Sequence, residues 1–266
     1  MRLGLLLLTA AGLGAQTSRD MADLNWMEFR ELVPAKVQTV LLPAGTLEAH
    51  GVENNGADIL APVAIAKEMA PRVNALVAPV VPYGVTGSLD AYAGGLTISE
   101  QAYRAYVGDV LKGLARQGFR NIIVVNGHGG PQTAILNQLA EQTGREHRVR
   151  TLVTNWWAYC GDVTLKIFGE DGGHAGWNET AFIQAINPKL IQRQRYSDAL
   201  ATPRPAEGAW SAYPFPSPII LYQPGQGLVK FDQAKADAYF RAVVDKMTGL
   251  VRETIAKWDR AGIFEH

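Results

Sequence analysis

Short apolar runs alternate with longer amphipathic stretches along the chain. The apolar runs are rich in branched residues and bounded by glycine, proline or asparagine, as buried strands are; they span 37–44, 75–84, 121–126 and 149–160. Helical spacing of apolar residues predicts helices at 18–33, 58–73, 99–118, 131–147, 179–186 and 231–258. This alternation predicts an α/β fold of three layers, with a central, mainly parallel sheet flanked by helices.

The N-terminal residues have the layout of a secretory signal peptide. Arg2 precedes an apolar run that begins at Leu3 and ends in small residues near Ala15, which is the order of a signal sequence and its cleavage site. The run is too short to span a bilayer comfortably. We therefore expect residues 1–15 to be removed and the mature protein to be secreted or periplasmic. A mis-assigned start codon or a buried strand is the alternative.

The length of the chain allows one large domain or two small ones, and we expect residues 16–266 to form a single domain. The chain is 47% hydrophobic and 19% charged, an ordinary globular balance with ample material for a core. The formal net charge is zero, which gives no reason to expect a nucleic-acid partner. Cys160 is the only cysteine, so no intrachain disulfide can form. The proline-rich segment 196–227 is predicted to be a lid or a subunit contact and not a regular element.

Three glycine-rich loops hold most of the candidate chemistry: GTLEAHGVENNGAD at 45–58, NGHGG at 126–130 and DGGHAGWN at 171–178. In a parallel sheet, such loops meet beyond the carboxyl ends of the strands. Each loop contains a histidine flanked by glycine, and acidic residues accompany these histidines. Imidazole and carboxylate groups are typical ligands of divalent metals. The pattern therefore predicts a metal site built from members of the set Glu48, His50, Asp58, His128, His174 and Glu179.

The motifs GTLEAHG followed by Asp58, VVNGHGG and GGHAGWNET resemble, in order and spacing, the three signature segments of the creatininase (creatinine amidohydrolase) family. The resemblance covers about residues 35–190. It implies an α/β fold with a mainly parallel sheet and a centre of two divalent metal ions, usually zinc or manganese. It also implies hydrolysis of a small-molecule amide, and assembly into homo-oligomers, commonly hexamers.

The same resemblance assigns roles to individual residues. Asp58 corresponds to the carboxylate that bridges the two ions, and His174 corresponds to a histidine implicated in proton transfer. Glu179 corresponds to an acidic position of the third segment, which makes it a candidate catalytic residue as well as a metal ligand. The further metal ligands that the resemblance implies are Glu48, His50 and His128.

The sequence departs from the family pattern at three places. The spacing between His50 and Asp58 is one residue shorter than the pattern. Glu53 belongs to a pair that replaces the usual Pro-His, so it is a candidate contact to metal or substrate. Gly130 stands where creatininase has a metal-binding glutamate. We therefore expect Glu179 to complete the second metal site, and the substitution argues against assuming creatinine as the substrate.

Two divalent ions held by histidines and carboxylates acidify a shared water, which gives a metal-activated hydroxide for attack on a carbonyl carbon. His174 would then protonate the departing nitrogen, a role that suits imidazole. Nitrogen and oxygen ligands without thiolate favour zinc or manganese, with iron possible. The predicted reaction is hydrolysis of a non-peptide C–N bond, in a cyclic amide or a formamide. Trp177 and Glu53 are the predicted substrate-binding residues, and at least one of Trp156 and Trp157 is expected in the core.

Three other functions remain open from the sequence. The same centre could hydrolyse a lactone or a cyclic ketone. A non-catalytic binding protein would use NGHGG to offer backbone amides to an anion, although Glu48 and Asp58 beside it argue against this interpretation. The third is a catalytically inactive homologue, which the replacement of a metal-binding glutamate by Gly130 would indicate.

Overall fold

The computed structural model describes residues 18–170, 172–203, 210–221 and 231–264. The predicted signal peptide, residues 1–15, lies outside the described residues. Within the described residues, no helix is long and apolar enough to cross a membrane.

A four-stranded, fully parallel sheet forms the centre of the molecule, with the strand order β2-β1-β3-β4. The strands are β1 (Thr39–Ala44), β2 (Ala75–Val77), β3 (Asn121–Asn126) and β4 (Arg150–Asn155). β1 pairs with β3 along its whole length, from Thr39 opposite Asn121 to Ala44 opposite Asn126. Every residue of β1, β2 and β3 is buried, as expected of parallel strands that are covered on both faces.

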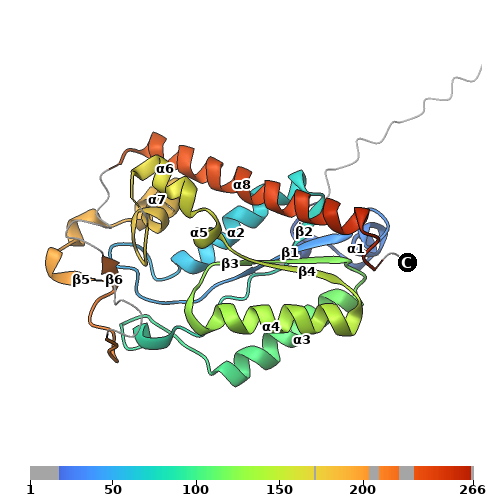
Figure 1. The fold of residues 1–266 in the computed structure, drawn as a ribbon, viewed down its shortest axis with the longest axis horizontal. Helices are drawn as coiled ribbons and strands as arrows, with labels where there is room; N and C mark the ends of the chain where they lie inside the picture. Colours follow the sequence, from blue (N-terminus) through green and yellow to red (C-terminus); the bar gives the residue numbers. More distant parts are fainter. Residues whose placement is uncertain (1–17, 171, 204–209, 222–230, 265–266) are drawn as a thin grey trace, which may run out of the picture.

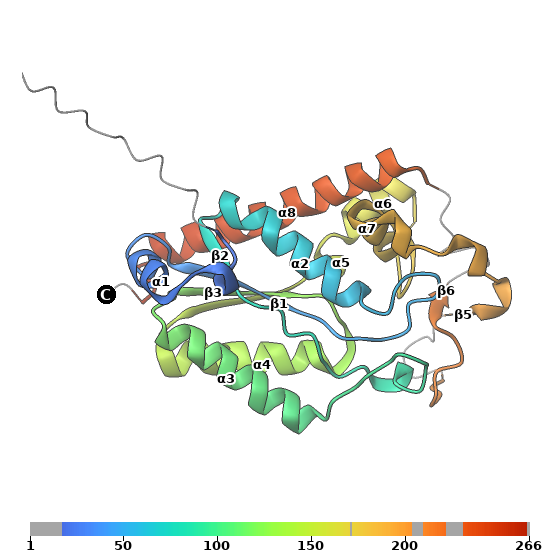
Figure 2. The same ribbon diagram turned by 180° about the vertical axis from the view of Figure 1, so that it is seen from behind.

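Helices cover both faces of the sheet, as Figures 1 and 2 show from opposite sides. One face carries α3 (Glu100–Arg116) and α4 (Gly130–His147). The other face carries α2 (Ala57–Met69), α7 (Trp177–Ile186) and the long α8 (Gln233–Arg260). The remaining α-helices are α1 (Trp26–Leu32), α5 (Trp156–Tyr159) and α6 (Gly161–Phe168). The three-layer α/β fold predicted from the sequence is thus confirmed.

Short 3₁₀ turns connect several of these elements: Met21–Asp23, Ala70–Arg72, Gly87–Leu89, Pro188–Leu190, Arg193–Arg195 and Asp198–Leu200.

The hydrophobic core has two halves, one on each face of the sheet. Alternate residues of a strand point to opposite faces, and neighbouring residues of β1 accordingly enter different halves. Leu41 packs with Phe182 and Tyr239 below α7 and α8. Leu42 packs in the other half, together with Tyr103 of α3.

Two predicted strands are shorter in the structure. β2 ends at Val77 because Pro79 and Pro82 follow, and proline has no N–H to donate to a ladder. β4 ends at Asn155, and the aromatic residues after it form α5. Trp156 lies in the core against Phe182, with ring centroids 4.7 Å apart, which confirms the expectation that one of this tryptophan pair is a core residue.

The proline-rich segment contains a short regular element that the sequence did not predict. β5 (Ala201–Pro203) pairs in parallel with β6 (Ile219–Leu221). Residues 204–209 and 222–230 of this region lie outside the described residues. The described part packs on the turn at 87–92, where the Phe215 N–H donates to the Ser88 carbonyl oxygen at 3.0 Å.

Candidate metal centre

The loop between β1 and α2 brings the first three candidate ligands to the carboxyl edge of the sheet. Glu48 and His50 lie in the loop, Asp58 lies in the first turn of α2, and all three are buried. The start of α2 packs directly on the ends of two strands. A Cβ atom on Gly45 would lie 2.2 Å from the Asp58 carbonyl oxygen, and one on Gly127 would lie 2.0 Å from it. Only glycine allows this approach.

His128 follows β3 and contacts the acids of the first loop. Its Nδ1 atom lies 2.8 Å from Asp58 Oδ2 and 3.2 Å from Glu48 Oε1. His50 reaches the other oxygen of the same carboxylate, with Nε2 at 3.0 Å from Asp58 Oδ1. Asp58 therefore lies between two imidazoles that come from different strand ends, and each of its oxygens faces one of them.

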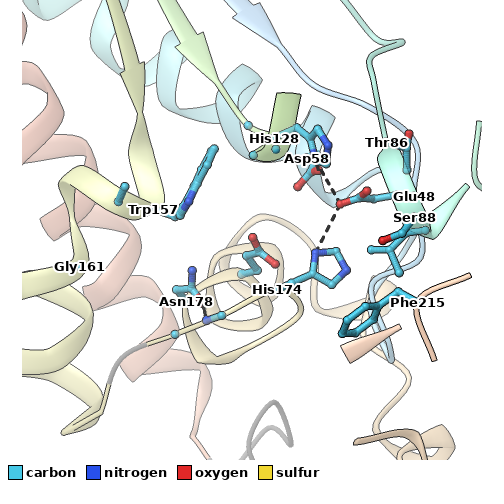
Figure 3. A pocket seen from close by; sticks show the side chains of 18 of the residues that line it. Glu48, Asp58, Thr86, Ser88, His128, Trp157, Gly161, His174, Asn178 and Phe215 are labelled. Carbon is cyan, nitrogen blue, oxygen red and sulfur yellow. Dashed lines mark hydrogen bonds and ion pairs between the residues drawn. The ribbon is translucent and has the colours of Figure 1, made fainter. Parts of the chain in front are cut away.

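The loop before α7 brings the last two candidate residues to the same place. His174 Nδ1 lies 3.4 Å from Glu48 Oε1. Glu179, in the first turn of α7, places Oε2 3.8 Å from His50 Nε2, and the same oxygen accepts the Ala175 N–H at 2.6 Å. Figure 3 shows His174, Glu48, Asp58 and His128 converging in the cavity.

Each of the three histidines has one ring nitrogen engaged by a backbone carbonyl. His50 Nδ1 lies 3.0 Å from the Glu48 carbonyl oxygen, His128 Nε2 lies 3.1 Å from that of Val85, and His174 Nε2 lies 2.7 Å from that of Ala49. A carbonyl accepts only from N–H, so these contacts fix the tautomers. The other nitrogen of each ring faces the carboxylates, and it would offer its lone pair to a bound cation, which is how metal-binding histidines are oriented.

The ligand atoms form overlapping sets in which all atoms lie within 4.8 Å of one another. One set is Glu48, Asp58 and His128, and a second is His50, Asp58 and Glu179. A third set joins His174 to Glu48 and His50. Asp58 belongs to the first two sets, so its carboxylate is common to two adjoining groups that could each hold a cation.

The charges of the cluster favour bound cations. Burial raises the pKa of Glu179 to about 8 and that of Glu53 to about 7, so without cations these acids hold protons near neutral pH. Burial alone would raise the pKa of Asp58 too, but the imidazoles of His50 and His128 keep this pKa well below its usual range. Glu48 Oε2 is buried and has no hydrogen-bond partner. Divalent cations would compensate these buried acids, so the residues fit a metal centre.

The histidines differ from one another in their electrostatics. Burial alone would lower the pKa of His128, but Glu48 and Asp58 raise it to about 10. The pKa of His50 is also raised by nearby acids, Asp58 above all, against the effect of its burial. His174 behaves in the opposite way, because burial and the adjacent His50 lower its pKa. The neutral form of His174 is therefore favoured, as a proton acceptor requires.

A closed network of hydrogen bonds holds His128 in place. Asn126 Oδ1 accepts from the His128 N–H and from Gln132 Nε2 at 3.2 and 3.0 Å. Gln132 Oε1 in turn accepts the Val85 N–H at 3.3 Å, and the Val85 carbonyl oxygen accepts from His128 Nε2. A Cβ atom on Gly84 would lie 1.8 Å from Gln132 Oε1. Gln132 thus connects the backbone at 84–85 to Asn126 at the end of β3. The same backbone orients the His128 ring through the Val85 carbonyl oxygen.

Neither residue predicted to bind substrate lines the cavity. Trp177 is buried in the core, where its ring centroid lies 6.0 Å from that of Phe231, so the prediction of a pocket position for Trp177 is wrong. Its place at the first position of α7 turns it toward α8 and away from the cluster. Glu53 is buried behind the cluster, where it accepts a hydrogen bond of 2.6 Å from the Thr180 hydroxyl. Substrate contact by Glu53 is likewise not supported.

A cavity of about 710 Å³ opens onto the cluster. Glu48, Asp58, His128, His174 and Glu179 all line it. The walls also include Trp157, Asn178 and Trp210, together with Ser88 and Phe215, which the sequence reasoning did not select. Gly130 also lines it, with φ +59° and no atom within 4 Å of the position of a Cβ. The position to which the family resemblance assigns a glutamate is thus open space here, and Glu179 is the second acid near His50, after Asp58.

A three-layer α/β fold carries buried imidazoles and carboxylates at the carboxyl edge of its parallel sheet, which is the arrangement of an enzyme scaffold with a candidate metal centre. A family model described as "Creatininase: Creatinine amidohydrolase" matches residues 22–251. The chain therefore belongs to the creatininase family and is a hydrolase of that family, which confirms the resemblance seen in the motifs.

Proteins of known function with similar sequences come from two groups. A creatinine amidohydrolase of Pseudomonas putida is 28% identical over 197 residues, which cover 67% of this chain and 75% of the relative. A mycofactocin precursor peptide peptidase of Mycobacterium ulcerans is 28% identical over 181 residues, which cover 64% of this chain and 67% of the relative.

Solved creatininase structures share the fold. A manganese form is 24% identical, with a TM-score of 0.78 over 90% of this chain and 99% of that one. A glutamate-to-glutamine variant complexed with creatine is 25% identical, with a TM-score of 0.77 and the same coverage.

Proposed function

We propose that this protein hydrolyses a non-peptide C–N bond, in a cyclic amide or a formamide, at a centre of two divalent metal ions. The observation that carries the proposal is the position of Asp58, whose two oxygens face His50 and His128 while Glu179 and Glu48 complete the two ligand sets. Zinc and manganese are the proposed metals, since related creatininase structures are described as zinc–zinc and manganese forms; iron also suits the ligands.

Bound cations at these two sets would acidify a water molecule and polarise the carbonyl of the substrate. His174 would carry the proton from the attacking water to the departing nitrogen. His174 Nε2–H donates a hydrogen bond to the Ala49 carbonyl oxygen, so Nδ1 carries the lone pair that would accept a proton from the attacking water. The same Nδ1–H then donates that proton to the nitrogen as the C–N bond breaks, which prevents expulsion of an amide anion.

Metal content and turnover together test the proposal. We expect the protein, purified under mild conditions and supplied with Zn²⁺ or Mn²⁺, to bind about two ions per chain, one for each ligand set that shares Asp58. The loaded protein should hydrolyse members of a panel of hydantoins, small lactams, formamides and creatinine. Failure to bind either metal would refute the metal centre. Two bound ions without hydrolysis of any panel member would refute the proposed bond type.

We further propose export through the N-terminal signal peptide and assembly into a homo-oligomer, by resemblance to the family. Support for export comes from the apolar run at residues 3–15. Fractionation of cells that express the full chain, with N-terminal sequencing of the product, tests export. Sedimentation of the purified protein tests assembly, and a monomer at all concentrations would refute it.

A further inference from the structure

Trp210 and Phe215 form a stacked pair on the cavity wall, here termed the aromatic shelf. Their ring centroids are 5.6 Å apart and the ring planes are inclined by 13°. Phe215 is buried, whereas Trp210 is 41% exposed, so Phe215 covers part of the indole and much of the remainder is open. Both residues line the same cavity as Glu48 and His174. The shelf therefore offers an aromatic surface to any molecule bound at the candidate metal centre.

Hydrogen bonds fix the Phe215 side of the shelf on the 87–92 turn. The Phe215 N–H donates to the Ser88 carbonyl oxygen at 3.0 Å, and the Tyr92 hydroxyl donates to the Phe215 carbonyl oxygen at 2.8 Å. The Tyr213 hydroxyl donates to Asp90 Oδ1 at 3.1 Å. An aromatic surface that is already positioned costs little conformational entropy when a ligand stacks on it.

The rest of the wall is uncharged outside the metal cluster. Among the described residues that line the cavity, every acid and imidazole belongs to the cluster, and none of them is lysine or arginine. Glycine, alanine, serine and leucine make up much of the remaining surface. The volume of about 710 Å³ falls in the range of sites for ligands of drug size, on the order of 300–1,000 Å³. A single five-membered ring would leave most of it empty.

We propose that the substrate is an uncharged amide with a planar apolar substituent, and that Trp210 determines specificity by stacking on this substituent. The inference rests on the proposed function for the bond that is cleaved. In Figure 3, Phe215 and Trp157 lie on opposite sides of the metal-ligand cluster. An amide placed at the cluster can thus direct a substituent onto the shelf without displacing Trp157.

Two matched pairs of probes test the proposal with the metal-loaded protein: 5-benzylhydantoin against 5-methylhydantoin, and N-benzylformamide against N-ethylformamide. We expect a higher kcat/KM for the benzyl member of each pair that is hydrolysed. Trp210→Ala should lower kcat/KM for the benzyl probe by about three- to tenfold, the worth of one aromatic stack, and leave the alkyl probe nearly unchanged. Trp210→Phe should retain most of the preference. Trp26→Ala, which removes an exposed tryptophan of α1 at the other end of the molecule, is the control.

Binding of the same probes, measured by calorimetry, separates this inference from the proposed function. If no probe is hydrolysed but the benzyl probes bind more tightly, and the difference disappears in Trp210→Ala, the proposed bond type fails and the inference stands. The inference is overturned, and the proposed function stands, if small amides are hydrolysed without a preference for the benzyl probe. The same conclusion follows if Trp210→Ala lowers kcat/KM equally for both members of a pair. The absence of both hydrolysis and benzyl-selective binding overturns both.

Discussion

The His174 Nε2 atom lies 2.7 Å from the carbonyl oxygen of Ala49. Ala49 is the residue between Glu48 and His50 in the first loop, so a backbone group of one ligand-bearing loop fixes the tautomer of a histidine from another. The lone pair of Nδ1 is thereby directed at the centre, 3.4 Å from Glu48 Oε1. The pKa separates the expected role of His174 from that of the other two histidines, because it is lowered by burial and by His50, whereas nearby acids raise the pKa of His50 and His128.

His174→Ala should retain bound metal and lose turnover. We expect kcat to fall by about 10²–10⁴-fold, as for the loss of a general acid–base group, with two ions per chain still bound. Steady-state kinetics with metal analysis of the same samples measures both quantities. His147→Ala, at the end of α4, is the control. Unchanged turnover in His174→Ala would assign the residue a structural role.

Asp58→Ala should abolish binding of both metal ions, because the carboxylate belongs to both ligand sets. Metal titration followed by calorimetry measures the stoichiometry, and circular dichroism verifies that the overall helix content is unchanged. Retention of one tightly bound ion would show that the two sites do not share Asp58.

Glu179→Ala should lose mainly one ion, at the set that contains His50, since the set of Glu48, Asp58 and His128 does not include Glu179. A titration that falls from two sites to one, with the remaining affinity unchanged, is the expected result. Two ions and full turnover in this variant would disprove the role of Glu179 as the acid that replaces the missing glutamate at Gly130.

Gln132→Leu should weaken one metal site without unfolding the protein. Gln132 is fully buried and joins the backbone that orients His128 to Asn126, and loss of such a supporting group typically lowers metal affinity about 10–100-fold. The affinity of the second site should change little. Gln138→Leu is the matched control, because Gln138 is exposed on the same helix. Equal weakening of both sites would indicate general damage to the fold.

The stability of the metal-free protein should fall as the pH rises from about 4.5 to about 8. The pKa of Glu179 is raised from 4.5 to about 8 in the folded state, so between these values the folded state binds more protons than the unfolded state. The free energy of unfolding decreases with pH under that condition. Urea unfolding at pH 5 and pH 8 measures the difference.

Glu179→Gln should flatten this dependence, and Glu100→Gln, an exposed change on α3, should not. Zn²⁺ should restore stability more at pH 8 than at pH 5, because the ligands must lose protons to bind it. An identical slope in Glu179→Gln would show that Glu179 does not cause the effect.

The sequence allowed the sheet and the metal cluster to be predicted for the same physical reason. Parallel strands are buried on both faces, so their apolar runs are conspicuous, and the polar loops that follow them meet at one edge. His50, His128 and His174 could be selected because glycine flanks each of them. The structure brings them together with Glu48 and Asp58 in the arrangement of two adjoining ligand sets.

The walls of the cavity were harder to predict, because the direction of an aromatic side chain depends on tertiary packing. Trp177 follows the motif histidine closely, yet the first turn of α7 directs it into the core. Trp210 and Phe215 come from a segment without clear periodicity. Hydrogen bonds of Phe215 to the 87–92 turn, and the stacking of the two rings, position them on the wall. The signal in the sequence was the concentration of aromatic residues among the prolines.

The close approach of Gly45 and Gly127 to the Asp58 carbonyl restricts both positions to glycine. A methyl group at either position would meet this backbone oxygen and push the first turn of α2 away from the ends of β1 and β3. Asp58 stands in that turn, so the position of its carboxylate depends on two residues that offer no metal ligand of their own. An alanine at either glycine would therefore disturb the candidate metal centre while every candidate ligand stays in the sequence.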